Sequence, residues 1–526
     1  MKLNRIKSLM PAVVLALSMG FVSCTKDLDV NNINPKQTST LDADALLNKI
    51  YSSFVLTGQQ GPDGNKDIAD LDEGRSDLYR KSWEMNEFPT GEASWQWDDT
   101  GLPELLNKTW GADNASSVGL YYRLFFSITL CNSYLSEVPE DGSTDVQMKR
   151  AEVRFIRALL YYYVMDLYAN AAFVETISLE PGVRYTREQY FKYIEDELLA
   201  IENDLAAPGA NDYGRVDKVA DWLLLSRLYL NAEVYTKNAR WQDAKTYAEK
   251  VINNGYYHLN TAGATNPTTG EVYSAYQMLF LADNDTNGAQ YEAIFPILHD
   301  GILTQSHGSM NFLVLASYAK RSDSDMDVNI PSGTDVSWGK CMAITGQVVD
   351  AFFGEGVNAP EETKVVTDVT NAAGDDRALF YTTKYTRNIE DRSDESNGYG
   401  CVKFRNVRSD GKATTAIAKV DTDLPLMRIA EAYLTYAEAE TRLNGSTTAA
   451  ADMINELHKR ANADTKTNYT LAEIQNEWVK EYWFEGRSRI DQVRFGTYNV
   501  PSYRYIYPIP VNDLLNNPNL VQNPGY

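Results

Sequence analysis

Many stretches in two long parts of the chain, residues 41–254 and 426–526, have apolar residues every three to four positions. This spacing is typical of amphipathic helices, which bury one face. Residues 255–425 lie between these parts, are rich in Gly, Asn, Asp and Thr, and contain few stretches with that period. Because so long a region is seldom plain loop, we expect a folded, loop-rich insertion with short strands near 293–298 and 401–407. The pattern predicts a mainly α fold.

The periodic stretches predict helices at 42–54, 119–138, 145–168, 187–205, 216–235, 241–253, 426–443, 449–461 and 470–485. Two of these helices resemble a tetratricopeptide repeat, with bulky, small and aromatic residues at that repeat's spacing: Trp222, Leu225, Ser226, Tyr229, then Ala244, Ala248 and Val251. Small residues allow paired helices to approach closely. We therefore expect a tetratricopeptide-like helical scaffold, although any Ala-rich amphipathic helix produces partial matches. The Pro-containing tail from residue 505 to residue 526 is predicted to be extended rather than helical.

Residues 1–23 have the composition of a targeting segment, with basic residues followed by an apolar run too short to span a bilayer. The run ends in Ser23 and Cys24, where lipoprotein signal peptides are processed. A plain secretory signal would give Cys24 no function, so lipidation at Cys24 is the favoured prediction. The polar residues 24–40 then form a lipid-anchored tether.

Composition narrows the function. The formal net charge of −23 argues against nucleic acid, since phosphate binding needs a basic face. The four cysteines and four histidines are widely spaced, and none has the spacing of a zinc site, a disulfide framework or a nucleophilic catalytic pair. Paired carboxylates leave no local signature, so an all-helical glycoside hydrolase remains an alternative.

A candidate binding surface lies within residues 72–110, which contain four of the nine tryptophans: Trp83, Trp95, Trp97 and Trp110. Trp95 and Trp97 are surrounded by Gly, Pro and Asp, which indicates loop. Flat rings beside carboxylates and arginine suit carbohydrate, because sugars present apolar C–H faces to rings and hydroxyls to polar groups. The alternative is that the rings close one end of a helical domain. We favour a binding surface.

Two Asp-x-Asp segments, at 283–285 and 421–423, are candidates for a cation site. In an extended chain, such spacing puts two carboxylates on one side, which suits the oxygen ligands of Ca²⁺. Neither segment has the loop of an EF-hand. Asp423 could instead cap the helix predicted to begin near residue 426.

Several motifs together resemble the SusD-like (RagB/SusD) family of outer-membrane lipoproteins: Cys24 after the signal, DEG at 72–74, Trp95-x-Trp97, AAGDDR at 372–377, DTDLP at 421–425, EGR at 485–487, YPIP at 507–510 and NPGY at 523–526. The resemblance covers residues 41–526 as one SusD-like domain. It implies a tetratricopeptide-like scaffold with an irregular lobe that binds glycan. It also implies a non-enzymatic, lipid-anchored protein facing outward from the outer membrane, which passes oligosaccharide to a TonB-dependent, SusC-like porin. A porin lid without glycan specificity is the other alternative.

The family's starch-binding pattern, carried over to this sequence, falls on Asp72, Arg80, Trp97, Thr100, His307 and Trp338. Thr100 replaces an Asn of that pattern and His307 replaces a Tyr, which puts starch itself in question. No cofactor is implied as a requirement. The same resemblance implies that Ca²⁺, if bound, would be held by Asp285, Asp421 and Asp423.

Overall fold

The structure is a computed structural model that describes residues 42–58, 61, 67–68, 71, 73–319 and 325–526. The predicted lipidation site, Cys24, and the predicted glycan-binding residue Asp72 lie outside the described residues. The chain divides into two units, residues 1–44 and 45–526. Among the described residues, no helix combines the length and apolar character needed to cross a membrane.

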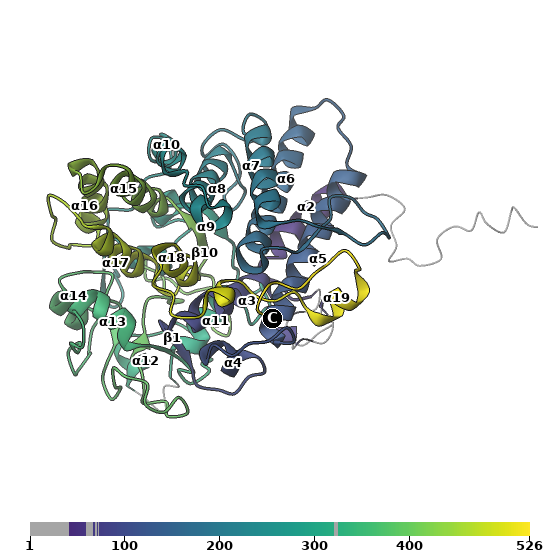
Figure 1. Cartoon of the computed structure of the whole chain (residues 1–526). Helices are drawn as coiled ribbons and strands as arrows, with labels where there is room; N and C mark the ends of the chain where they lie inside the picture. Colours follow the sequence, from purple (N-terminus) through teal and green to yellow (C-terminus); the bar gives the residue numbers. More distant parts are fainter. Residues whose placement is uncertain (1–41, 59–60, 62–66, 69–70, 72, 320–324) are drawn as a thin grey trace, which may run out of the picture. The chain divides into compact units, whose positions relative to one another are not determined.

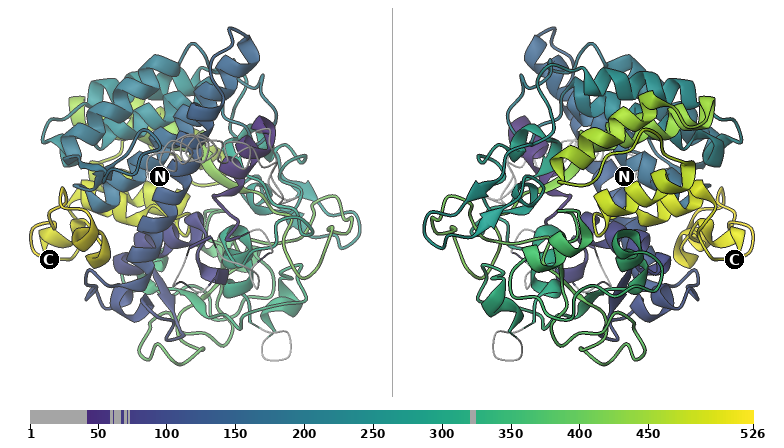
Figure 2. Two further views of the ribbon diagram at one scale, coloured as in Figure 1. Left: turned by 90° about the vertical axis from the view of Figure 1, so that its right-hand side faces the viewer. Right: turned by 90° about the vertical axis from the view of Figure 1, so that its left-hand side faces the viewer.

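A row of helices forms the scaffold of the second unit: α5 (Ala115–Glu137), α6 (Thr144–Tyr168), α7 (Arg187–Ile201), α8 (Lys218–Leu230), α10 (Trp241–Ile252), α15 (Ala430–Asn444), α16 (Thr448–Arg460) and α17 (Leu471–Tyr482). Most neighbours in this order pack on each other, notably α5 on α6, α6 on α7, α8 on α10 and α10 on α15, and both α16 and α17 pack on α15. Figures 1 and 2 show this row on one side of the loop-rich segments. The predicted mainly α, tetratricopeptide-like scaffold is confirmed.

Local sequence explains where these helices begin. Capping boxes start α7 at Thr186 and α17 at Thr470, and the Asp217 side chain accepts the backbone N–H of Val219 at the start of α8. Ser226 of α8 and Ala248 of α10 are completely buried. Small side chains there allow the two helices to pack closely, as the repeat pattern predicts.

Short helices accompany the scaffold: α2 (Ala43–Ser52), α3 (Leu78–Glu87), α4 (Leu102–Leu106), α9 (Ala232–Thr236), α11 (Ser309–Ser317), α12 (Met326–Asn329), α13 (Gly346–Phe353), α14 (Thr367–Ala373), α18 (Ser488–Phe495) and α19 (Val511–Asn516). The strands form antiparallel pairs: β1 (Ala93–Trp95) with β7 (Met342–Ile344), β2 (Ala172–Phe173) with β3 (Val183–Arg184), β4 (Ala264–Thr265) with β5 (Val272–Tyr273), β6 (Ala293–Ile297) with β10 (Leu424–Arg428), and β8 (Phe380–Tyr381) with β9 (Gly400–Cys401). The β1–β7 pair joins residues 93–95 to the loop-rich segment.

Several predicted boundaries change. The strand near 293–298 is confirmed as β6, whereas 401–407 contributes only Cys401 to a strand. The helix predicted for 426–443 was wrong at its start, because β10 pairs with β6 there and α15 begins at Ala430. Asp423 therefore precedes a strand and caps no helix. The tail is not wholly extended, since α19 interrupts it.

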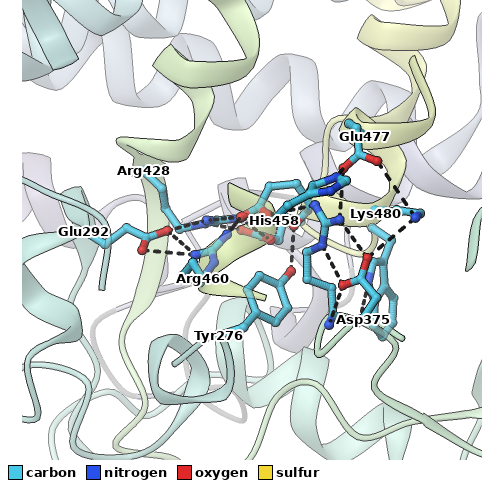
Figure 3. Close-up of polar contacts among 12 residues, drawn as sticks. Tyr276, Glu292, Asp375, Arg428, His458, Arg460, Glu477 and Lys480 are labelled. Carbon is cyan, nitrogen blue, oxygen red and sulfur yellow. Dashed lines mark hydrogen bonds and ion pairs between the residues drawn. The ribbon is translucent and has the colours of Figure 1, made fainter. Parts of the chain in front are cut away.

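A network of buried charges joins the scaffold to the loop-rich lobe (Figure 3). Arg428 at the end of β10 and Arg460 at the end of α16 each donate to Glu292 Oε1, with both N–O distances 2.9 Å. Both also bind Glu481 of α17, at 2.9 and 2.5 Å. Tyr276 of the lobe donates its hydroxyl to the carbonyl of Glu481 at 2.6 Å. The lobe is thus fixed to the scaffold by ionic and hydrogen-bonding contacts.

Candidate glycan-binding site

The site is built around Arg80, which projects from α3. The N-cap residue Asp77 accepts the backbone N–H of Arg80 at 2.8 Å and so fixes the start of the helix. The Arg80 side chain is buried, and its Nε donates to Glu84 Oε1 one turn later at 3.1 Å. Burial lowers the pKa of the Arg80 guanidinium, and the Glu84 carboxylate opposes this effect. The guanidinium is therefore held in one orientation.

Glu84 collects several donors beneath the site. Lys81 Nζ lies 2.6 Å and Ser116 Oγ 2.8 Å from its Oε2, and Arg75 Nη2 lies 3.8 Å from its Oε1. Burial alone would raise the pKa of Glu84, but Lys81, Arg75 and Arg80 outweigh it and lower the pKa to about 2. The carboxylate is consequently ionised and balances the cations that surround it.

Aromatic rings surround the Arg80 guanidinium. Its central carbon lies 4.7 Å from the ring centre of Phe312, 5.4 Å from that of Trp338 and 5.7 Å from that of Trp95. Arg80 Nη1 also donates to the carbonyl of His307 at 3.0 Å. The His307 ring meets Trp338 edge-on, with centroids 5.7 Å apart. Segments distant in sequence are thereby brought to one cation.

Trp97 extends this aromatic group outward. Its ring meets Trp95 edge-on at 5.7 Å, and 42% of Trp97 is exposed. Trp95 is buried, and its indole N–H donates to Asp99 Oδ2 at 2.6 Å. A buried ring thus supports an exposed one. An exposed, rigidly supported indole can stack on the apolar face of a sugar.

Thr100 lies at the edge of the same group, with an exposed side chain. Its carbonyl accepts a long hydrogen bond of 3.5 Å from Arg75, one of the cations around Glu84. The structure therefore brings together five of the six predicted residues: Arg80, Trp97, Thr100, His307 and Trp338. The sixth, Asp72, is not described.

Glycines allow two segments to approach the site closely. A Cβ atom at Gly74 would lie 2.8 Å from His307 Nδ1, and one at Gly308 would overlap the Asp77 carboxylate. Larger residues at either position would displace His307 or α3. These glycines account for part of the DEG motif and for the residue after His307.

The prediction that four tryptophans form a binding surface is wrong for three of them. Trp83, Trp95 and Trp110 are buried, and the Trp83 N–H donates to the carbonyl of Phe484 at 2.9 Å. Tyr507 similarly donates to the carbonyl of Met85 at 2.7 Å. Phe484 covers Trp83, Tyr507 covers Trp110 and Phe312 covers Trp95, so only Trp97 of the four is exposed.

The three predicted calcium ligands are neighbours with different environments. Asp423 is buried. Burial is the main cause that raises the pKa of its carboxyl to about 7, and the like charges of Asp285 and Asp421 add to this effect. The Asp421 carboxylate accepts hydrogen bonds from the backbone N–H groups of Gly301 and Thr415, at 2.9 and 2.7 Å. The donor chemistry suits Ca²⁺, but no three His, Cys, Asp or Glu side chains within the described part of the chain are gathered as a metal site. Calcium binding stays a prediction.

Comparison with known proteins identifies the family. The SusD family model matches residues 359–502. The starch-binding protein SusD of Bacteroides thetaiotaomicron is 36% identical, and the match covers 100% of both chains.

Solved structures agree in fold. A SusD superfamily protein from Parabacteroides distasonis is 21% identical, with a TM-score of 0.66 over 93% of this chain and 100% of its own. A laminarin-binding SusD-like protein is 18% identical, with a TM-score of 0.67 over the same shares. The full-length match, the helical scaffold and the gathered site residues lead to one conclusion: this chain belongs to the SusD family.

Proposed function

We propose that this protein binds oligosaccharide at the surface formed by Trp97, Trp338, Arg80 and His307, without cleaving it. The supporting observation is the exposed Trp97 ring on a buried ring, beside a guanidinium fixed by Glu84. Trp97 and Trp338 would stack on sugar faces, and Arg80 would donate to hydroxyls. A curated relative named for starch binding and a structural neighbour named for laminarin binding support carbohydrate as the ligand class.

The family also supports a cellular setting for this binding. We propose that Cys24 carries the lipid anchor, that the protein faces outward from the outer membrane, and that it delivers glycan to a TonB-dependent, SusC-like porin. Two results would test the setting. The porin should co-purify with the full-length lipidated protein, and the Cys24→Ala variant of this protein should be lost from the membrane fraction.

The binding test compares two tryptophan variants by isothermal titration against a panel of oligosaccharides. Removing a stacking ring costs about 1–3 kcal/mol, so Trp97→Ala should weaken binding about 5- to 150-fold. Trp222→Ala on α8 is the matched control, because its indole is bound to Glu202, on the scaffold. Equal affinity in Trp97→Ala and wild type would disprove this site.

Two further variants address the ligand. His307→Tyr and Thr100→Asn restore the residues of the starch-binding pattern, and we expect them to raise affinity for maltooligosaccharide if the site is retuned. Incubation with each glycan should release no new reducing ends. Their appearance would favour the glycoside hydrolase alternative instead.

A further inference from the structure

A loop of residues 386–397 runs beside the exposed Trp97 and the half-buried Trp338. The Thr386 N–H donates to the Ser396 carbonyl at 2.8 Å and closes the loop. Inside it, the Asn397 side-chain oxygen accepts the N–H groups of Glu390 and Asp391, at 2.7 and 3.2 Å. Lys340, two residues after Trp338, donates to the Asn397 carbonyl at 3.2 Å. The loop is therefore an ordered part of the site.

Arg392 of this loop holds the segment that carries Trp97. Its Nη1 donates to the carbonyls of Trp95 and Trp97, at 3.3 and 3.2 Å. Its Nη2 lies 2.5 Å from Asp98 Oδ1. The planar guanidinium can satisfy several acceptors at once, which an ammonium group cannot. Fixing the backbone on both sides of Trp97 lowers the conformational entropy that the ring would lose on binding.

The loop also places negative charge beside the site. Glu390, Asp391, Asp394 and Glu395 are exposed, whereas the two loop arginines are paired, Arg392 with Asp98 and Arg387 with Asp350. Hydrogen bonds from Ser393 and Ser396 lower the pKa of Asp391 and of Asp394, so both are ionised at neutral pH.

The loop that carries these carboxylates extends from one tryptophan to the other. The Gln96 side chain, next to Trp97, donates to the Asp394 carbonyl at 3.4 Å. At the other end, a Cβ atom on Gly339, next to Trp338, would lie 3.8 Å from Glu395 Oε1. A sugar lying on both rings would pass along this acidic edge.

We propose that the 386–397 loop is a selectivity element of the glycan site: Arg392 is a positioning residue for Trp97, and the loop carboxylates admit uncharged saccharides and repel those with carboxylate or sulfate groups. The hydroxyl groups of neutral sugars can donate hydrogen bonds to these carboxylates. An anionic sugar would face like charges at a partly exposed surface, where repulsion weakens with salt. The inference rests on the proposed function.

The positioning part is tested with Arg392→Ala, Arg392→Lys and, as control, Arg387→Ala from the same loop. We expect Arg392→Ala to weaken maltoheptaose binding about tenfold, mainly through faster dissociation, with an unchanged midpoint of urea unfolding. Arg392→Lys should recover only part of this loss, and Arg387→Ala should bind as wild type. Equal affinity of Arg392→Ala and wild type would overturn the positioning role.

The charge part is tested with the triple variant Asp391→Asn/Asp394→Asn/Glu395→Gln. Its control, Glu188→Gln/Asp196→Asn/Glu249→Gln, makes the same charge change on exposed scaffold positions. The probes are maltoheptaose and its C6-oxidised, carboxylate-bearing derivative, which share one backbone. We expect the loop variant to gain about tenfold in affinity for the oxidised probe relative to maltoheptaose at low salt, and the gain to shrink at high salt.

The outcomes separate the two proposals. A wild type that binds no saccharide in the panel would overturn the proposed function together with this inference. A wild type that binds maltoheptaose, with the same probe preference in the loop variant and the scaffold variant, would overturn the charge filter alone.

Discussion

Two buried groups of charge in this protein are built alike and serve different surfaces. Below the proposed glycan site, Glu84 gathers Lys81, Arg75 and Arg80. Between scaffold and lobe, Glu481 gathers cations in the same way: Arg377, Arg428 and Arg460. In both groups the cations outweigh the effect of burial and lower the carboxylate pKa to about 2. Only the first group presents a guanidinium, that of Arg80, to aromatic rings at the proposed ligand surface. The second group supports the fold, and the first is proposed to support binding as well.

The largest effect is expected at the structural group. Glu481→Ala leaves three buried guanidinium groups without a common partner and should lower the free energy of unfolding by about 3–5 kcal/mol, measured in urea. Glycan affinity of the folded fraction should stay at the wild-type value. Glu456→Ala removes an exposed partner of Lys459 and should leave the free energy of unfolding close to the wild-type value. A similar cost for both variants would contradict the distinction between buried and exposed pairs.

The second prediction concerns Glu84→Gln, which keeps the shape of the side chain and removes its charge. Lost charge-assisted hydrogen bonds should lower the free energy of unfolding by about 1.5–3 kcal/mol. Because Arg80 loses its charged partner, glycan affinity should fall as well, unlike in Glu481→Ala. Glu104→Gln, exposed on α4, is the control. Unchanged glycan affinity in Glu84→Gln would contradict a binding role for the Glu84 group.

The smallest expected effect is that of calcium at Asp423. Its raised pKa, about 7, means that the folded protein keeps a proton that the unfolded chain releases near its ordinary value of 3.8. Stability from this group therefore falls as pH rises from about 4 to about 7, and is level above that. Calcium at about ten times its Kd should add about 1.4 kcal/mol at pH 8 and less at pH 5. Thermal unfolding of wild type and Asp423→Asn would test this, and equal shifts in both would exclude Asp423 as a ligand.

The scaffold could be predicted because its determinants are local. Ser226 and Ala248 sit at helical spacing and pack where that spacing puts them. The structure at the start of residues 426–443 could not be predicted, because an apolar run suits either a helix or a buried strand. Its pairing with β6, more than one hundred residues earlier, decided the outcome.

The site was only partly predictable for the same reason. Trp83, in a polar sequence context, is buried by Phe312 and Phe484, which come from distant segments. Phe312 and Arg392 were missed altogether, because nothing local connects Phe312 with Arg80 or Arg392 with Trp97. Loop composition pointed to Trp97 and the family pattern to Trp338, but the rings that connect each of them with Arg80 became visible only in the fold.

The hydrogen bonds from Trp83 to Phe484 and from Tyr507 to Met85 have a consequence for biosynthesis. They close loops of 401 and 422 residues around α3, the helix that carries Arg80. Contacts of such sequence separation form late, because the chain entropy of the loop must be lost first. A ribosome that has made the first three hundred residues has therefore not yet made the proposed binding site. A chain truncated before residue 484 should keep much of its helical row and still fail to present Arg80 to a ligand.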